Sequence, residues 1–162
     1  MNEDRMIQRD RMRFIRNSLS ASLCYLGILF NVFYFVNLYQ SDVGTYYYQI
    51  FIGASIVYNL LFLLFVCLAS ESVKNYKKNY SYLLAAAGAM QIVRIFYIPM
   101  KAHAAMTAVN GVDVPVMSDG QFYLLSAFLL VSAACLLVSA AVNFKKCQEL
   151  AEHMKALEAQ EG

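Results

Sequence analysis

The sequence contains no tryptophan, only two histidines and only two prolines, and charged residues make up just 15% of it. Soluble domains of ordinary composition carry about 25% charged residues. Both histidines, His103 and His153, lie outside the long apolar segments. The sequence therefore predicts neither haem ligation by histidine within a membrane nor a zinc site of His/Glu type. We expect no metal and no cofactor.

Aspartate and glutamate are absent from the four long apolar segments, which removes the obvious titrating group for a proton-coupled or cation-coupled transport cycle. The chain has no GxSxG motif, no CxxC pair and no basic stripe with interleaved aromatic residues. We therefore predict that the protein is not an enzyme, has no catalytic residue and does not bind nucleic acid. The four cysteines are expected to be reduced, three of them packed inside helices.

What the sequence does contain is apolar surface, because 60% of its residues are hydrophobic. About 20 consecutive apolar residues are enough for one helical crossing of a bilayer. Four segments satisfy this length, at about residues 19–39, 46–69, 80–98 and 121–143. They predict an all-α integral membrane four-helix bundle, formed as one domain over residues 1–162.

Positive charge is distributed asymmetrically along the chain. Eleven of the 13 Lys and Arg residues lie in the N-terminal segment, in the connection around residues 70–79, or in the tail from residue 144 onward. Cytoplasmic segments of membrane proteins are enriched in Lys and Arg. We therefore expect a multi-pass protein of the plasma membrane with both termini in the cytoplasm. The absence of a disulfide framework and of glycosylated loops favours a bacterial origin.

The two segments outside the predicted bundle each have a recognisable pattern. Residues 104–117 surround Asn110-Gly111, the preferred pair for a tight hairpin turn, and predict a short external β-hairpin. Ser118 and Gln121 then have the spacing of a capping box. The cytoplasmic tail, residues 144–162, is expected to continue the last helix. Its apolar face is a candidate for binding a partner, or for lying on the membrane surface; that face includes Cys147, Leu150, Met154 and Leu157.

Small residues indicate where the helices approach one another, since close packing rather than apolar burial drives helix association in lipid. Gly88 lies in an alanine-rich stretch of the third segment. The fourth segment repeats small residues at an interval of seven; they are Ser126, Ala133 and Ala140, beside Ala127, Ala134 and Ala141. These two segments are expected to contact each other, or a copy in a second subunit.

Polar residues recur at similar depth in three segments, namely Asn31, Asn59 beside Tyr58, and Gln91 on the same face as Arg94. One interpretation is an interhelical hydrogen-bond network that holds the bundle together. The other is a pocket for a small solute or a lipid headgroup, with these five residues as its ligand-binding side chains.

Arg94 itself has three explanations. It could snorkel to the outer surface or form a salt bridge with an aspartate of the external loops; it could contact an anion or headgroup; or a partner subunit could supply its carboxylate. The candidate aspartates are Asp42, Asp113 and Asp119.

These features predict an accessory or scaffolding subunit of a membrane complex, or a homo-oligomer, with membrane lipids and other membrane subunits as its partners. The alternative is a small transporter or a lipid- or solute-binding membrane protein that uses the polar residues at midplane. A membrane enzyme ranks third.

Overall fold

The computed structural model describes residues 15–39, 46–109 and 111–161. Four helices in this part of the chain are long and apolar enough to cross a membrane. They are α2 (Ser18–Tyr39), α3 (Tyr46–Lys74), α4 (Asn79–Tyr97) and α6 (Asp119–Glu161). The predicted helical class and the four apolar spans are confirmed. α3 runs five residues further than predicted, so that only residues 75–78 connect it to α4.

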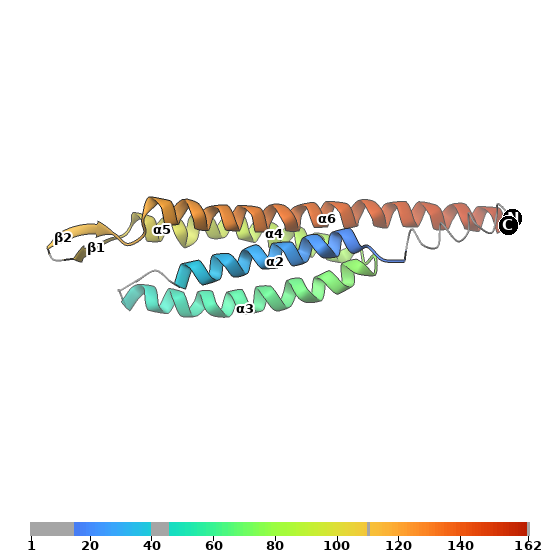
Figure 1. Cartoon of the computed structure of the whole chain (residues 1–162). Coiled ribbons are helices and arrows are strands. Elements are labelled where there is room, and N and C mark those ends of the chain that lie inside the picture. The colour runs from blue at the N-terminus through green and yellow to red at the C-terminus, as the bar shows by residue number, and fades with distance from the viewer. Residues whose placement is uncertain (1–14, 40–45, 110, 162) are drawn as a thin grey trace.

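The helices pack around α6, which lies along the whole bundle and projects beyond it as one helix of 43 residues (Figure 1). α2 and α4 both pack against α6, whereas α3 packs on the other side, against α2 and α4. As predicted, the tail continues the last helix without a break. α3 also exposes bulky side chains to the surroundings of the bundle, among them Leu60, Leu61 and Leu64.

Glycine permits close approach at two points on α6. A Cβ atom on Gly88 would lie 2.9 Å from Leu137 Cγ and 3.2 Å from the carbonyl oxygen of Ala133. A Cβ atom on Gly27 of α2 would meet Leu136 of α6 at 3.1 Å. The predicted contact between the third and fourth apolar segments therefore occurs within one chain.

The small residues of α6 divide between the inside and the outside of the bundle. Ala133 and Ala140 are buried and Ser126 is half-buried, in line with the packing prediction. The neighbouring row faces outward instead; its members Ala127, Ala134 and Ala141 are exposed. That second row is therefore no part of the seam within the chain, because two partner helices cover only one side of α6.

The helix predicted to end before Pro99 is followed directly by another. α5 (Pro99–Ala104) begins at this proline, which is tolerated at the first helical position because its missing N–H has no partner there. His103 stacks on Phe122 of α6 with a ring separation of 4.8 Å. Its Nε2 atom lies 3.6 Å from Asp119 Oδ1. These contacts attach α5 to the beginning of α6.

The predicted hairpin is present as an antiparallel pair of strands, β1 (Met106–Val109) and β2 (Val112–Pro115). Pro115 pairs with Met106 at the open end of the hairpin, and Gly111 has a φ of +80°, as a tight turn requires. Asn110 lies outside the described residues. Ser118 then caps α6, since its Oγ accepts a hydrogen bond of 3.4 Å from the backbone N–H of Gln121.

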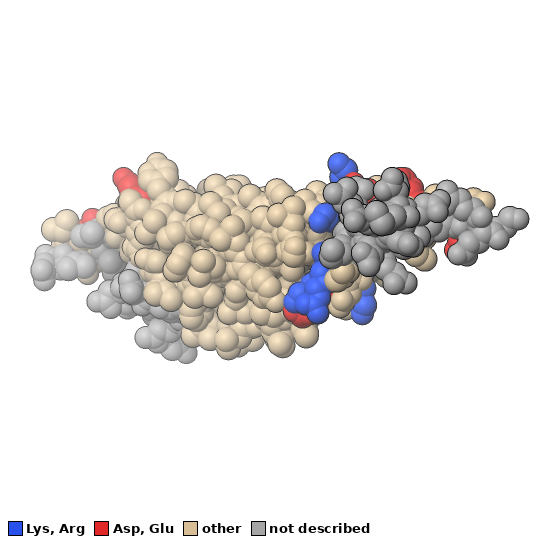
Figure 2. Space-filling model, turned by 45° about the vertical axis from the view of Figure 1, so that its right-hand side comes forward, with Lys and Arg blue, Asp and Glu red and all other residues tan. Residues whose placement is uncertain are grey.

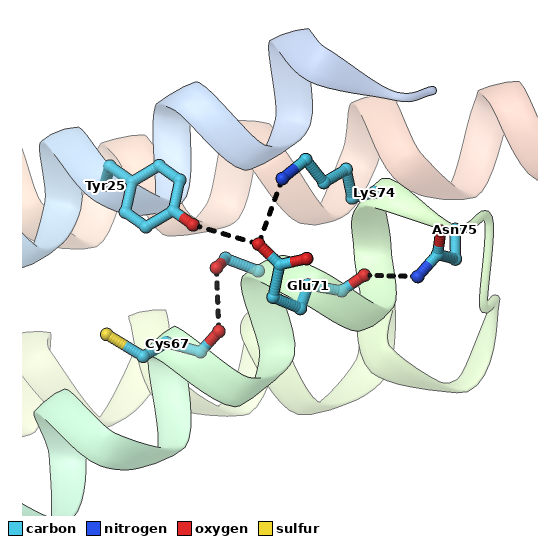
Figure 3. A network of polar contacts seen from close by, with 6 residues as sticks. Tyr25, Cys67, Glu71, Lys74 and Asn75 are labelled. Carbon is cyan, nitrogen blue, oxygen red and sulfur yellow. Dashed lines mark hydrogen bonds and ion pairs between the residues drawn. The ribbon is translucent and has the colours of Figure 1, made fainter. Parts of the chain in front are cut away.

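The two ends of the bundle differ in charge (Figure 2). Lys and Arg side chains, with some acidic ones among them, gather where the uncharged part ends and the projecting part of α6 begins, whereas the charged side chains visible at the opposite end are acidic. At the basic end, α2 is joined to α3 through Glu71, whose carboxylate accepts hydrogen bonds from Tyr25 at 3.3 Å and Lys74 at 3.0 Å (Figure 3). Asn75 in turn binds the backbone carbonyl oxygen of Glu71 at 3.0 Å.

Candidate functional site

The polar residues predicted at similar depth come together inside the bundle. Asn31 of α2, Asn59 of α3 and both Gln91 and Arg94 of α4 are buried, with at most 6% of any of these side chains exposed. We call these four residues the Arg94 cluster. Tyr58 is half-buried beside it. Asn31 belongs to a buried face of α2, whose residues recur at alternating intervals of four and three; they are Ser20, Cys24, Gly27, Asn31 and Tyr34.

Two amide oxygens carry most of the connections in the Arg94 cluster. Asn31 Oδ1 accepts hydrogen bonds from Gln91 Nε2 at 2.9 Å and from Arg94 Nη1 at 3.1 Å. Asn59 Oδ1 accepts from Arg94 Nη2 at 3.0 Å and from Asn31 Nδ2 at 3.3 Å. Arg94 Nη1 also donates to Gln91 Oε1 at 3.0 Å. The cluster thus joins three helices through one guanidinium.

Arg94 lies against aromatic rings as well as amides. Its Cζ atom is 4.5 Å from the centre of the Tyr58 ring and 4.7 Å from that of Tyr34. Snorkelling to the surface is therefore wrong for this residue, because its guanidinium points into the bundle and only 6% of the side chain is exposed. Asp119, one of its expected partners, instead lies beside His103, and Asp42 is outside the described residues.

The inward orientation has a simple energetic basis. A charged side chain at the centre of a bilayer costs about 2.5–3.5 kcal/mol on the insertion scale. A hydrogen bond to a charged group contributes about 1.5–3 kcal/mol. Three hydrogen bonds to Asn31, Asn59 and Gln91 are thus large enough to offset the cost. The contacts with two tyrosine rings add cation–π attraction.

Arg94 also lines a pocket between α3 and α4. The pocket has a volume of about 410 Å³. It opens on the outer surface of the bundle, since the rim residues Ala54, Val93 and Tyr97 are exposed. Among the described residues, its polar lining comes from Ser55, Tyr58, Arg94 and Tyr97 and the rest is apolar. Arg94 therefore connects the cluster to a pocket on the side of the bundle that would face lipid.

Three residues of this site were not among the predicted ligand-binding side chains. Ser55 accepts hydrogen bonds from Asn59 Nδ2 through its backbone oxygen at 2.8 Å and through its hydroxyl at 3.4 Å. Tyr34 contributes a ring, and Ser132 of α6 accepts a hydrogen bond of 3.5 Å from Gln91. Helical spacing places Tyr34 on the face of Asn31, and Ser55 on that of Asn59. This spacing was the signal that could have identified both.

The predicted partner-binding face of the tail is partly used within the chain. Cys147 is buried, and its thiol donates to the backbone oxygen of Tyr76 at 3.1 Å. The connection between α3 and α4 therefore already covers Cys147 within the chain. Leu150 is half-buried and Met154 is exposed. The side chain of Leu157 lies outside the described residues.

No protein-family model matches this chain, and neither a curated protein nor a solved structure is significantly similar to it. The site therefore has to be interpreted from its own geometry.

Proposed function

We propose that this chain is a non-enzymatic multi-pass membrane protein that binds a lipid or a small polar solute in the pocket between α3 and α4. The observation that carries the proposal is the position of Arg94. Its side chain is buried among amides, yet it lines a pocket that opens on the outer surface of the bundle. A concave, mostly apolar site with a few convergent polar groups is the usual form of a ligand site.

The packing of the small residues supports binding over scaffolding as the first function. Gly88 and Ala133, both predicted to hold helices together, are occupied by the contact between α4 and α6 of the same chain. They are therefore not available to attract a second subunit. The pocket, in contrast, is not filled by any described part of the chain.

The charge distribution supports an orientation in which both termini lie in the cytoplasm, with the hairpin outside the plasma membrane. The test is thiol labelling of intact cells with a reagent that does not cross membranes. We expect Asp113→Cys in β2 to react, and Lys77→Cys in the connection between α3 and α4 to react only after lysis. The opposite pattern would reverse the topology.

The binding function is tested by native mass spectrometry of the protein purified in mild detergent. We expect the wild-type chain to retain a small molecule and the Ala54→Phe variant, whose ring would fill the pocket, to lose it. Ala89→Phe is the matched control, because Ala89 is exposed on α4 but does not line the pocket. Failure of the wild-type chain to retain any small molecule from native membranes would count against the proposal.

A second function, as an accessory subunit of a membrane complex or as a homo-oligomer, is favoured by the projecting part of α6. This segment extends beyond the other helices, and Met154 on it is 54% exposed. Deletion of residues 150–162 leaves Cys147 and its contact with Tyr76 in place. If this deletion leaves the native mass and every copurifying subunit unchanged, the second function loses its support.

A further inference from the structure

The pocket at Arg94 continues into a second hollow along the same helix pair. This second pocket has a volume of about 360 Å³. It shares Tyr58 and Met90 with the first, so the two follow one another between α3 and α4. The further described residues that line it are all apolar; they are Leu61, Phe62, Phe65, Leu83, Ala86 and Ala87. We call the two pockets together the α3–α4 groove.

Charge is confined to one end of the groove. Among the described residues that line it, Arg94 is the only charged one. Arg94 lies three residues before the end of α4 at Tyr97, whereas the apolar part extends back to Leu83. The groove is thus amphipathic along its length, with a cation at one end and hydrocarbon along the rest.

The length of the groove fits one leaflet of a bilayer. Leu83 and Arg94 are eleven positions apart in α4, which is about 16 Å at the helical rise per residue. The hydrocarbon core of a bilayer is about 30 Å thick, so one leaflet contributes about 15 Å. A chain lying in the groove would therefore reach from the region of the headgroups to the middle of the membrane.

We propose that the α3–α4 groove holds a membrane lipid with an anionic phosphate headgroup, the headgroup at Arg94 and one acyl chain along the apolar part. This proposal rests on the proposed binding function and names its ligand class. Arginine suits a phosphate because its guanidinium is planar, always charged and less strongly hydrated than an ammonium group. Attraction between opposite charges is also stronger in an apolar site than in water.

The groove favours a lipid over a free anion for a geometric reason. Its rim residues Val93 and Tyr97 are exposed on the outer surface of the bundle, where lipid chains would contact a membrane-spanning helix. A free phosphate would use the end at Arg94 alone and would leave the apolar part, from Met90 to Leu83, without a function.

The absence of tryptophan allows a direct test, because a single introduced tryptophan reports on its own surroundings. Leu83→Trp places this reporter at the apolar end of the groove. Tyr82→Trp is the matched control, since Tyr82 is one position away and exposed but lines neither pocket. Each full-length variant is reconstituted in phosphatidylcholine vesicles. Lipids with dibrominated chains, which quench tryptophan on contact, are then titrated in.

We expect dibrominated phosphatidate to quench Leu83→Trp at a mole fraction at least about tenfold lower than dibrominated phosphatidylcholine does, equivalent to about 1.4 kcal/mol. The two lipids should quench Tyr82→Trp equally. Adding Arg94→Gln to the reporter should abolish the preference. Adding Ala86→Phe, which fills the groove but leaves the Arg94 cluster intact, should weaken quenching by both lipids.

Equal quenching of Leu83→Trp by the two lipids would overturn the inference, and so would a preference that survives Arg94→Gln. Displacement of the phosphatidate by inorganic phosphate alone would show that the headgroup end binds a free anion, and would also overturn it. In each of these cases the proposed binding function stands if native mass spectrometry still finds a molecule that Ala54→Phe removes. The proposed binding function fails together with this inference only if the wild-type chain retains no small molecule at all.

Discussion

Two buried polar clusters lie towards opposite ends of the bundle, and they differ in charge. The first, which we call the Asn143 cluster, consists of Asn17, Ser81 and Asn143. It joins the beginning of α2, the first turn of α4 and α6. Asn143 Oδ1 accepts a hydrogen bond of 3.0 Å from Asn17, and Asn143 Nδ2 donates to Ser81 Oγ at 2.8 Å. All of its side chains are neutral. The Arg94 cluster joins α2, α3 and α4 in the same manner, but around a charge.

A buried hydrogen-bond network between helices does not need a charged side chain. Neutral side chains are sufficient to connect three helices in the Asn143 cluster, and they do so without the cost of burying a charge. None of that cluster lines either of the two pockets described here, whereas Arg94 lines one of them. Arg94 thus differs from every member of the Asn143 cluster in two ways, because it carries a charge and because it lies in the wall of a pocket.

The largest effect is expected when the buried charge of Arg94 loses an amide side chain that accepts its hydrogen bond. Asn31→Leu removes an oxygen that accepts from both Gln91 and Arg94, and leaves the guanidinium with fewer partners. We expect a loss of about 3 kcal/mol in the free energy of unfolding, measured by detergent-driven unfolding in mixed micelles. Arg94→Met removes the charge together with its need for hydrogen-bond acceptors, and should therefore lower the free energy of unfolding by less. The reverse order would mean that Arg94 is mainly structural.

A smaller effect is expected at the helix contact that lies between the two clusters. Gly88→Ala places a methyl group 2.9 Å from Leu137 Cγ and 3.2 Å from a backbone oxygen of α6. Overpacking of this kind costs about 1–3 kcal/mol, which the same unfolding measurement would detect. Gly53→Ala on α3 is the control, because no atom lies within 4 Å of the added carbon. Equal stability of the two variants would contradict the close packing of α4 on α6.

The Asn143 cluster should contribute less to the free energy of unfolding than the Arg94 cluster does. Hydrogen bonds between neutral groups of membrane helices average about 0.6 kcal/mol, so Asn143→Leu should cost about 1 kcal/mol. It should also loosen the connection between α3 and α4, to which Asn143 donates at Lys77. Cys147, now held against Tyr76, should then react faster with thiol reagents, while buried Cys24 should not. Unchanged labelling of Cys147 would indicate that the connection is held by other contacts.

The smallest effect is expected outside both clusters, on the projecting part of α6. Met154 is 54% exposed, and surface substitutions usually change stability by less than about 0.5 kcal/mol. Met154→Ser should therefore leave both the unfolding free energy and the native mass unchanged if the tail is free. A clear decrease in either quantity would show that this face is covered by another subunit.

Much of the architecture could be predicted because it depends on properties of single segments. Runs of about 20 apolar residues define four spans, and a helical repeat places Asn31 and Tyr34 of α2 on the buried face. The pattern of the tail likewise predicts the continuation of α6. The sequence could not separate the two rows of small residues on α6, because small residues at the same interval lie on both its covered and its uncovered sides.

The direction of Arg94 and the existence of the groove were decided by tertiary structure. Near the end of a spanning helix, a long cationic side chain can reach water or turn inward, and the sequence is compatible with both. It turns inward here because α2 and α3 bring two amide oxygens to within 3.1 Å of its guanidinium. Hydropathy, charge distribution and periodicity determined the number of spans and their inner faces. Which faces meet, and what space remains between them, follows only from how the helices pack in three dimensions.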